Sequence, residues 1–431
     1  MRRWGKWILV GLVGLTLALG VIEGIEIRNL VMKLLGYEGR QHYVVLLQNN
    51  MELWPTGGYM GSYAEFWTES GAIKDLKIEA IDVPSGQIKG YVAAPDPIVK
   101  YTHQGGTPGW RLRESNWEPD FPKASREIEW FFTEGGLEPI DTMVATNLIP
   151  IVEVLRVIGP ITLLDYGVTV TADNFYQETQ ARVEMGFFDG STQKRDFLGY
   201  LGRLMVEKIK NGNVNYLKLG QILINSLETK QIMIATKDAT MGAWLKEKNW
   251  DGSLWPMANE DYVYVNEANL GINKTNCCIE REFNDEIEIA TEAPQIKHQL
   301  MLKFVNRNPG TPKPPEAWGG GYQVYIRVYL PPNSEVGGIT GLDREVRADS
   351  IIVEQREGKT IVGFLGEIGG GESGRYQLIY WVPTKSTKEP YELRIQKQSG
   401  VVSIPWNISV LKGNRTKTWQ GQVDRDMTLS F

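Results

Sequence analysis

Tyr43-Val-Val-Leu-Leu47 is a short apolar run without polar alternation. Such a run is typical of a strand that is buried on both faces of a sheet. Around it, further strands are expected at residues 59–67, 73–81 and 141–145, with a hairpin turn at Ser70-Gly71. Apolar residues at helical spacing predict helices at residues 125–133, 148–158 and 197–209. This alternation predicts an α/β domain over residues 41–212, in which helices cover a mixed sheet.

The C-terminal part of the chain has a different pattern. Apolar side chains alternate with more polar ones in residues 322–330, Tyr-Gln-Val-Tyr-Ile-Arg-Val-Tyr-Leu. Residues 376–381 and 391–396 show the same alternation. Clusters of proline and glycine separate these segments. The pattern predicts a β-sandwich-like domain over residues 261–431. Between the two domains, helical segments and a strand at residues 231–235 predict a connecting region over residues 213–260.

Composition limits the functional classes. The 431 residues contain 42% hydrophobic and 23% charged residues, which is typical of globular domains. The formal net charge of −6 gives no support for nucleic-acid binding, so we expect no nucleic-acid partner. Three histidines and two adjacent cysteines, Cys277 and Cys278, leave little room for a zinc or Cys–His site.

The N-terminus predicts a membrane segment. Arg2, Arg3 and Lys6 precede an uncharged apolar run from Trp7 to Ile22. The run is somewhat shorter than the ~20 residues that cross a hydrocarbon core, so a cleaved signal peptide is the alternative. Apolar spacing continues to Leu35, which favours a retained anchor and juxtamembrane helix over residues 1–35. Because positive charge stays in the cytoplasm, both alternatives place the bulk of the chain outside it.

The first candidate site follows the buried strand at residues 47–59. Gly57 and Gly58 can adopt backbone conformations closed to other residues and can expose N–H groups to an anion. Three polar side chains add candidate ligand contacts: Asn49, Asn50 and Thr56. The alternative is a tight turn between two strands with no further role.

The second candidate site is the loop at residues 110–122, which is too rich in proline for a regular element. Arg111 and Arg113 suit phosphate or carboxylate oxygens, and Asn116 adds a polar contact. Asp120 can hold a divalent cation through its oxygens. Alternatively, the aromatic residues of the loop plug the sheet edge, and Asp120 caps the following helix.

A third candidate site is the start of the helix at residues 197–209. Lys194 and Arg195 stand before it and would add to the positive end of the helix dipole. A solvated charge cluster is the alternative. Of the histidines, only His103, next to Gly105-Gly106, lies beside a motif worth testing.

Two of these stretches carry a resemblance. Residues 48–58 (Gln-Asn-Asn-x-Glu-x-x-Pro-Thr-Gly-Gly) and 116–122 (Asn-Trp-x-Pro-Asp-Phe-Pro) resemble the bacterial family called domain of unknown function 4012, as do residues 269–276 and 391–400. Members are known chiefly as membrane-anchored envelope proteins without an assigned reaction. One departure is Trp54, where relatives commonly have arginine.

A more distant resemblance links residues 140–161 and the basic pair Lys194-Arg195 to the LytR-CpsA-Psr proteins. Those are extracytoplasmic enzymes that transfer glycopolymers from polyprenyl-pyrophosphate carriers to the cell wall, with arginines on the pyrophosphate and acidic residues on magnesium. The resemblance implies an LytR-CpsA-Psr-like α/β fold and Asp82 as a cation ligand. The chain departs from the family at Ile81-Asp82, where an Arg-Asp pair is expected.

Two functional hypotheses follow for an extracytoplasmic cell-envelope protein. In the first, it binds or transfers a phosphorylated, polyprenyl-linked glycopolymer. Its catalytic residues would be Asp82, Arg111, Arg113 and Asp120, with Lys194 and Arg195 on the anion and Mg²⁺ on Asp82 or Asp120. In the second, it is a non-catalytic module that binds an envelope polymer or a partner protein, with the sandwich as its working surface.

Overall fold

The computed structural model describes residues 28, 31–102, 109–184, 193–212, 214–256, 261–290, 295–311, 313, 318–383 and 390–431. The chain forms two compact units, each made of three segments. The first, here called the α/β unit, comprises Met1–Asn49, Thr56–Tyr91 and Arg111–Ser253. The second, the β unit, comprises Asn50–Pro55, Val92–Trp110 and Leu254–Phe431.

The predicted membrane run, residues 7–22, lies outside the described residues. Within the described ranges, no helix combines the length and the apolar character needed to cross a bilayer. Residues 31–34 are helical, and the Leu34 carbonyl accepts hydrogen bonds from the Tyr43 and Thr68 hydroxyls. The end of the expected juxtamembrane helix is therefore held against the first two strands of the α/β unit.

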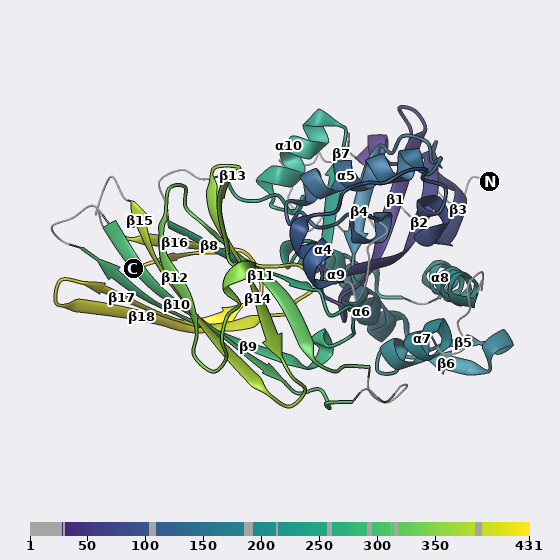
Figure 1. Cartoon of the computed structure of the whole chain (residues 1–431). Helices are drawn as coiled ribbons and strands as arrows, with labels where there is room; N and C mark the ends of the chain where they lie inside the picture. The colour runs from purple at the N-terminus through teal and green to yellow at the C-terminus, as the bar shows by residue number, and fades with distance from the viewer. Residues whose placement is uncertain are drawn as a thin grey trace. The chain divides into compact units, whose positions relative to one another are not determined.

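The α/β unit is built on a five-stranded mixed sheet with the order β3-β2-β1-β4-β7 (Figure 1). β1 pairs in parallel with β4, and the other neighbouring pairs are antiparallel. The strands are β1 (Gln41–Asn49), β2 (Tyr59–Glu69), β3 (Ala72–Ala80), β4 (Thr142–Thr146) and β7 (Ile232–Thr236). A separate hairpin is formed by β5 (Ile161–Leu163) and β6 (Val168–Val170). The mixed α/β sheet expected from the sequence is confirmed.

Helices cover both faces of this sheet. Ile232 and Ile234 of β7 pack with α9 and α10, while Met233, which points to the opposite face, contacts Gly252 beside Phe121 of α5. The α-helices are α3 (Asp82–Ser85), α5 (Phe121–Glu134), α6 (Leu148–Ile158), α7 (Phe175–Glu184), α8 (Gln193–Asn211), α9 (Tyr216–Glu228) and α10 (Ala239–Glu247). Two short 3-10 helices are η1 (Leu112–Glu114) and η2 (Leu164–Tyr166). The expected connecting region, residues 213–260, thus supplies one strand and two helices to the α/β unit.

The β unit contains two six-stranded sheets (Figure 1). One has the order β12-β15-β10-β9-β17-β18, made of β9 (Ile279–Ile289), β10 (Gln295–Asn306), β12 (Glu335–Gly341), β15 (Ser373–Pro383), β17 (Ile404–Lys412) and β18 (Arg415–Val423). The other has the order β13-β14-β11-β8-β16-β19, made of β8 (Asp261–Asn269), β11 (Tyr322–Leu330), β13 (Ile352–Arg356), β14 (Lys359–Ile368), β16 (Glu392–Gln396) and β19 (Met427–Ser430). The unit also holds α4 (Asp96–Tyr101), η3 (Asn276–Cys278) and η4 (Ala348–Ser350).

Side chains from both sheets share one hydrophobic core. Phe283 and Phe304 come from the first sheet and Ile326 and Phe364 from the second, and all four are nearly inaccessible. This arrangement confirms the expected β-rich C-terminal region. One strand differs from its sequence pattern: the residues of β11 alternate, which predicts one exposed face, but both faces of β11 are buried. On the face away from the core, Tyr329 belongs to a second cluster with Tyr262 and Tyr264, against which residues 254–255 pack.

Candidate functional site

Several predicted site residues gather at one edge of the five-stranded sheet. β1, β3 and β4 run in the same direction, so their carboxyl ends meet at this edge, where β2 and β7 begin. Asn49 ends β1, and Asp82 follows the end of β3. In open α/β sheets, ligands commonly bind outside the carboxyl ends of the strands. This carboxyl edge is therefore the place to look for a site in the α/β unit.

A buried hydrogen-bond network holds the glycine turn at this edge. The Thr56 hydroxyl accepts hydrogen bonds from Gln48 Nε2 at 2.7 Å and from Asn116 Nδ2 at 2.9 Å. Asn116 Nδ2 also donates to the Gly58 carbonyl at 2.9 Å. Thr56, Asn116 and both glycines are buried, and Gly57 has a φ of 122°, which favours glycine. The network holds the turn in place, so the Thr56 hydroxyl and the Asn116 amide have a structural role.

Arg113 and Asp82 are brought together by η1 and the end of β3. Arg113 Nη1 lies 3.8 Å from Asp82 Oδ1, and Arg113 Nε lies 3.5 Å from Glu114 Oε1. Burial disfavours the charged guanidinium, but Tyr59 and the carboxylates of Glu114 and Asp82 outweigh burial and raise the pKa of Arg113. Two carboxylates thus stand beside one guanidinium, so negative groups outnumber the positive one here. Glu114, which is itself buried, was not among the residues expected at the site.

Asp120 immediately precedes helix α5. Its Oδ1 accepts a hydrogen bond from the Lys123 backbone N–H at 3.1 Å, as an N-cap residue does. Pro122 stands in the first turn, where its missing N–H costs nothing. Arg111 precedes η1, and its carbonyl accepts the N–H of Glu114. Asp120 therefore has the structural role that the sequence left open as the alternative.

The remaining predicted residues lie apart from this cluster. Asn50 belongs to the β unit, where its side chain donates to the Gly400 carbonyl at 3.3 Å and its carbonyl accepts from Asn276. Lys194 and Arg195 stand in the first turn of α8, and their side chains lie outside the described residues, as does His103. Among the described side chains of the expected set, the structure joins Asp82 to Arg113, and Thr56 and Gly58 to Asn116.

Acidic side chains at the carboxyl edge are the candidates for a cation site. Asp82 is largely exposed, with 65% of its side chain accessible, and it faces Arg113. Within the described ranges, no three His, Cys, Asp or Glu side chains converge in a way that could hold a metal ion. Asp82 would be the protein ligand for Mg²⁺ here, with the remaining oxygens supplied by water or substrate.

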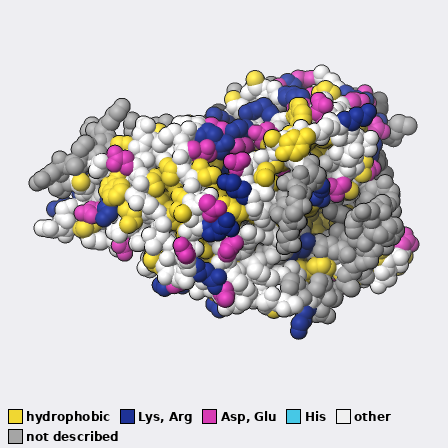
Figure 2. All heavy atoms as spheres, viewed as in Figure 1, with side chains coloured by type: hydrophobic (Ala, Val, Ile, Leu, Met, Phe, Trp, Pro, Cys, Tyr) yellow, Lys and Arg dark blue, Asp and Glu magenta, His cyan; other side chains and the backbone are white. Residues whose placement is uncertain are grey.

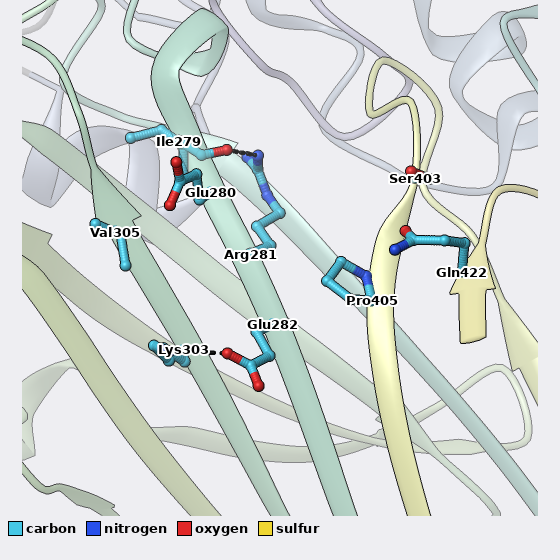
Figure 3. A pocket seen from close by; sticks show the side chains of 9 residues that line it. All are labelled: Ile279, Glu280, Arg281, Glu282, Lys303, Val305, Ser403, Pro405 and Gln422. Carbon is cyan, nitrogen blue, oxygen red and sulfur yellow. Dashed lines mark hydrogen bonds and ion pairs between the residues drawn. The ribbon is translucent and has the colours of Figure 1, made fainter. Parts of the chain in front are cut away.

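A pocket of about 420 Å³ lies in the β unit (Figure 3). Pockets that bind small ligands commonly have volumes of ~300–1,000 Å³. It is lined by Ser403, just before β17, and by residues of β9, β10, β17 and β18: Ile279, Glu280, Arg281, Glu282, Lys303, Val305, Pro405 and Gln422. In Figure 3 the Lys303 ammonium points to the Glu282 carboxylate, at 2.8 Å. The alternating pattern of the C-terminal strands predicts that one face of this sheet points to solvent, but it does not predict the pocket on that face.

One face of the molecule carries both signs of charge. On the face drawn in Figure 2, basic and acidic side chains are interspersed, and neither sign forms a broad field there. This mixture agrees with the small negative net charge of the chain.

The fold is thus a helix-covered mixed sheet joined in one chain to a β-rich unit with two six-stranded sheets. The family described as "Protein of unknown function (DUF4012)" has a model that matches residues 38–183. This match covers the glycine turn and the loop with Asn116 and Asp120, and it supports the expected resemblance to that family.

Other comparisons give weaker likenesses. No curated protein matches the sequence. Among solved structures, a candidate nutrient-binding protein of Legionella pneumophila is 9% identical with a TM-score of 0.26, over 35% of this chain and 66% of that one. An M1 zinc metallopeptidase from Deinococcus radiodurans is 13% identical with a TM-score of 0.20, over 34% and 39%. Native leukotriene A4 hydrolase from Saccharomyces cerevisiae is 8% identical with a TM-score of 0.19, over 35% and 27%. In each case this chain spans less than two thirds of the other protein.

Proposed function

We propose that this protein is a non-catalytic module of the bacterial cell envelope, anchored by its N-terminus and displayed outside the cytoplasm, where it binds an envelope polymer. One observation carries the choice of binding over catalysis. Arg113, which pairs with Asp82, is also flanked by the Glu114 carboxylate. The two carboxylates repel a pyrophosphate, and their repulsion outweighs the attraction of the single guanidinium.

Other residues expected at the catalytic or ligand-binding site support the same proposal. Asp120 caps α5, and the Thr56 hydroxyl and Asn116 amide hold the glycine turn. The Asn116 amide nitrogen, for example, would have to give up its hydrogen bonds to Thr56 and Gly58 before it donated to a substrate. Because a buried polar group left without a partner costs ~1–3 kcal/mol, that exchange is unfavourable.

Cosedimentation with envelope material tests the proposal. The full-length protein, kept in detergent, is mixed with purified envelope polymer of the source bacterium, in Mg²⁺ and in EDTA. We expect equal binding in both, and no transfer of labelled glycan from a polyprenyl-pyrophosphate carrier. Absence of binding, or transfer that requires Mg²⁺, would refute the proposal.

The expected location has its own test. The cationic residues before the run at residues 7–22 are the basis for placing the bulk of the chain outside the cytoplasm. A reporter fused after Phe431 that is active only outside the cytoplasm is the expected result. A reporter active only in the cytosol would contradict both the location and the envelope role.

Transfer of a phosphorylated, lipid-linked glycopolymer is the second candidate function. It is favoured by the approach of Asp82 to Arg113 at the carboxyl edge, where a cation and an anion site would stand side by side. If it is right, Asp82→Asn abolishes Mg²⁺-dependent binding of polyprenyl pyrophosphate, and the control Asp75→Asn, also on the surface of the α/β unit, does not. Equal binding by both variants would exclude Asp82 from such a site.

A further inference from the structure

The pocket of the β unit is the end of a regular, outward-facing surface. Along β9 and β10, alternate side chains point away from the core, so one face of the sheet carries rows of residues that cross several strands. The pairing of the strands places one row at the pocket, in the order Lys303, Glu282, Pro405 and Gln422. The pocket is therefore built by four neighbouring strands.

The charges in and around this pocket cancel in pairs. Glu282 Oε2 lies 2.8 Å from Lys303 Nζ, and Glu280 Oε2 lies 2.9 Å from Arg307 Nη2. The guanidinium of Arg281, which also lines the pocket, is turned to Glu267 with distances of 2.6 and 3.0 Å. A pocket with balanced charge offers little to a phosphate or another strong anion, and its two glutamates oppose one.

The same groups suit hydroxyls. A hydroxyl donates one hydrogen bond and accepts others, and the Glu282–Lys303 pair presents an acceptor beside a donor. Both side chains remain partly accessible, at 39% and 42%. Gln422 can donate and accept, and Val305 and Pro405 offer apolar surface for C–H groups. Adjacent hydroxyls on a sugar ring would match this arrangement.

The next row extends the polar surface. Asn407 Nδ2 donates to Asn284 Oδ1 at 2.7 Å, and Gln420 lies opposite Asn407 on β18. This row runs parallel to the row at the pocket, one step of two residues along each strand. A ligand longer than the pocket would therefore meet uncharged amide groups rather than fixed charges.

We infer that this pocket binds an uncharged saccharide segment, and that the amide row beside it contacts the next residues of the same chain. The inference rests on the proposed polymer-binding function and gives it a place and a ligand class. It selects a neutral, polyhydroxylated polymer over a phosphorylated one.

The strands themselves offer a matched test. Glu282 and Lys303 oppose each other across β9 and β10, and so do Glu288 and Lys297, on the same face and the same strands but at the other end. The pocket variant Glu282→Ala/Lys303→Ala and the control variant Glu288→Ala/Lys297→Ala therefore remove the same groups from two places. Full-length protein is titrated by calorimetry with cellotetraose, with the tetramer of β-1,4-linked N-acetylglucosamine, and with inorganic pyrophosphate.

We expect at least one neutral tetrasaccharide to bind the unmodified protein and the control variant with the same Kd. In the pocket variant the Kd rises about tenfold or more, since two hydrogen bonds to charged groups are lost. The inference is overturned if neither tetrasaccharide binds, if both variants bind alike, or if pyrophosphate binds at the pocket instead. Envelope polymer still cosedimenting with the pocket variant would leave the proposed function in place and reject only this site.

Discussion

His298 Nε2 of β10 lies 2.8 Å from Asp261 Oδ2 of β8, so a hydrogen bond joins the two sheets of the β unit through their core. His298 Nδ1 lies 2.9 Å from Asp285 Oδ2 of β9. The Tyr391 hydroxyl also donates to Asp261, and the Tyr380 ring stacks on the imidazole. All five side chains are buried, so this cluster is structural and out of reach of a substrate.

We predict that His298→Leu strongly destabilises the β unit. Without the imidazole, two buried carboxylates face each other without a cation, and breaking a buried ion pair in this way costs ~3–5 kcal/mol. Urea denaturation followed by tryptophan fluorescence measures the loss. A second variant, Asp261→Asn/Asp285→Asn/His298→Leu, removes the charges as well and should recover part of the stability. A loss below about 1 kcal/mol in His298→Leu would contradict the assignment of a charged imidazole.

The same cluster predicts a dependence of stability on pH. Burial alone would lower the pKa of His298, but the Asp285 and Asp261 carboxylates outweigh burial and raise the pKa to about 10, from 6.5. The folded protein therefore keeps a proton that the unfolded chain releases. This contribution to the free energy of unfolding is complete below pH 6.5 and is lost as the pH rises through about 10.

The measurement is urea denaturation at several pH values between 6 and 10. We expect the free energy of unfolding to fall by roughly 1 kcal/mol per pH unit over this interval. The His298→Leu variant should lack that component of the slope. Parallel pH profiles for the two proteins would show that the imidazole does not hold the proton.

Thr56→Val tests the glycine-turn network. The substitution keeps the shape of the side chain but leaves the buried amides of Gln48 and Asn116 without their shared acceptor, which costs ~1–3 kcal/mol. Thr56→Ser retains the hydroxyl and is the matched control. Chemical denaturation of both variants provides the measurement, and equal stability of the two would exclude a role for the hydroxyl.

Asp120→Ala separates the cap from a metal ligand. Loss of an N-cap side chain typically costs ~1 kcal/mol, whereas Asp120→Asn keeps an oxygen that can accept the Lys123 N–H. We therefore expect Asp120→Ala to lower the thermal midpoint and Asp120→Asn to leave it close to that of the unmodified protein. A Mg²⁺-dependent stabilisation that disappears in Asp120→Asn would instead identify the carboxylate as a cation ligand.

Leu53→Ala tests the short segment at residues 50–55, which lies within the first candidate site expected from the sequence. Leu53 is fully buried in the core of the β unit, and its carbonyl accepts the Asn269 N–H at 2.8 Å. Truncating a buried leucine to alanine typically costs ~2–5 kcal/mol. Met51→Ala, a half-buried neighbour, is the control and should cost clearly less, as judged by denaturant midpoints.

Local sequence patterns predicted single elements well. The expected helix at residues 148–158 coincides with α6, and the apolar run at residues 43–47 is the middle of β1, the central strand of its sheet. Helix α5 begins at Phe121 rather than at residue 125, because Asp120 caps it and Pro122 fits its first turn. In each case the deciding interactions lie within a few residues of the chain.

Long-range relationships could not be predicted in this way. A strand was expected at residues 231–235 and is found as β7, but its place beside β4 depends on pairing between segments about ninety residues apart. Likewise, nothing local connects Arg113 with Asp82, or Asn116 with Thr56. The His298 cluster did leave a signal, because Asp285 and His298 occupy inward positions in strands whose other inward residues are mostly apolar. A charged residue at such a position predicts a buried partner.

The chain passes between its two units five times, after Asn49, Pro55, Tyr91, Trp110 and Ser253. Leu53 thus reaches the core of the β unit from a place in the sequence more than two hundred residues ahead of most of that unit. A gene fragment starting at codon 254 would encode every strand of the two six-stranded sheets and still lack this leucine. Recombination at a single junction therefore cannot transfer the β unit intact to another protein. The two units are expected to be inherited together.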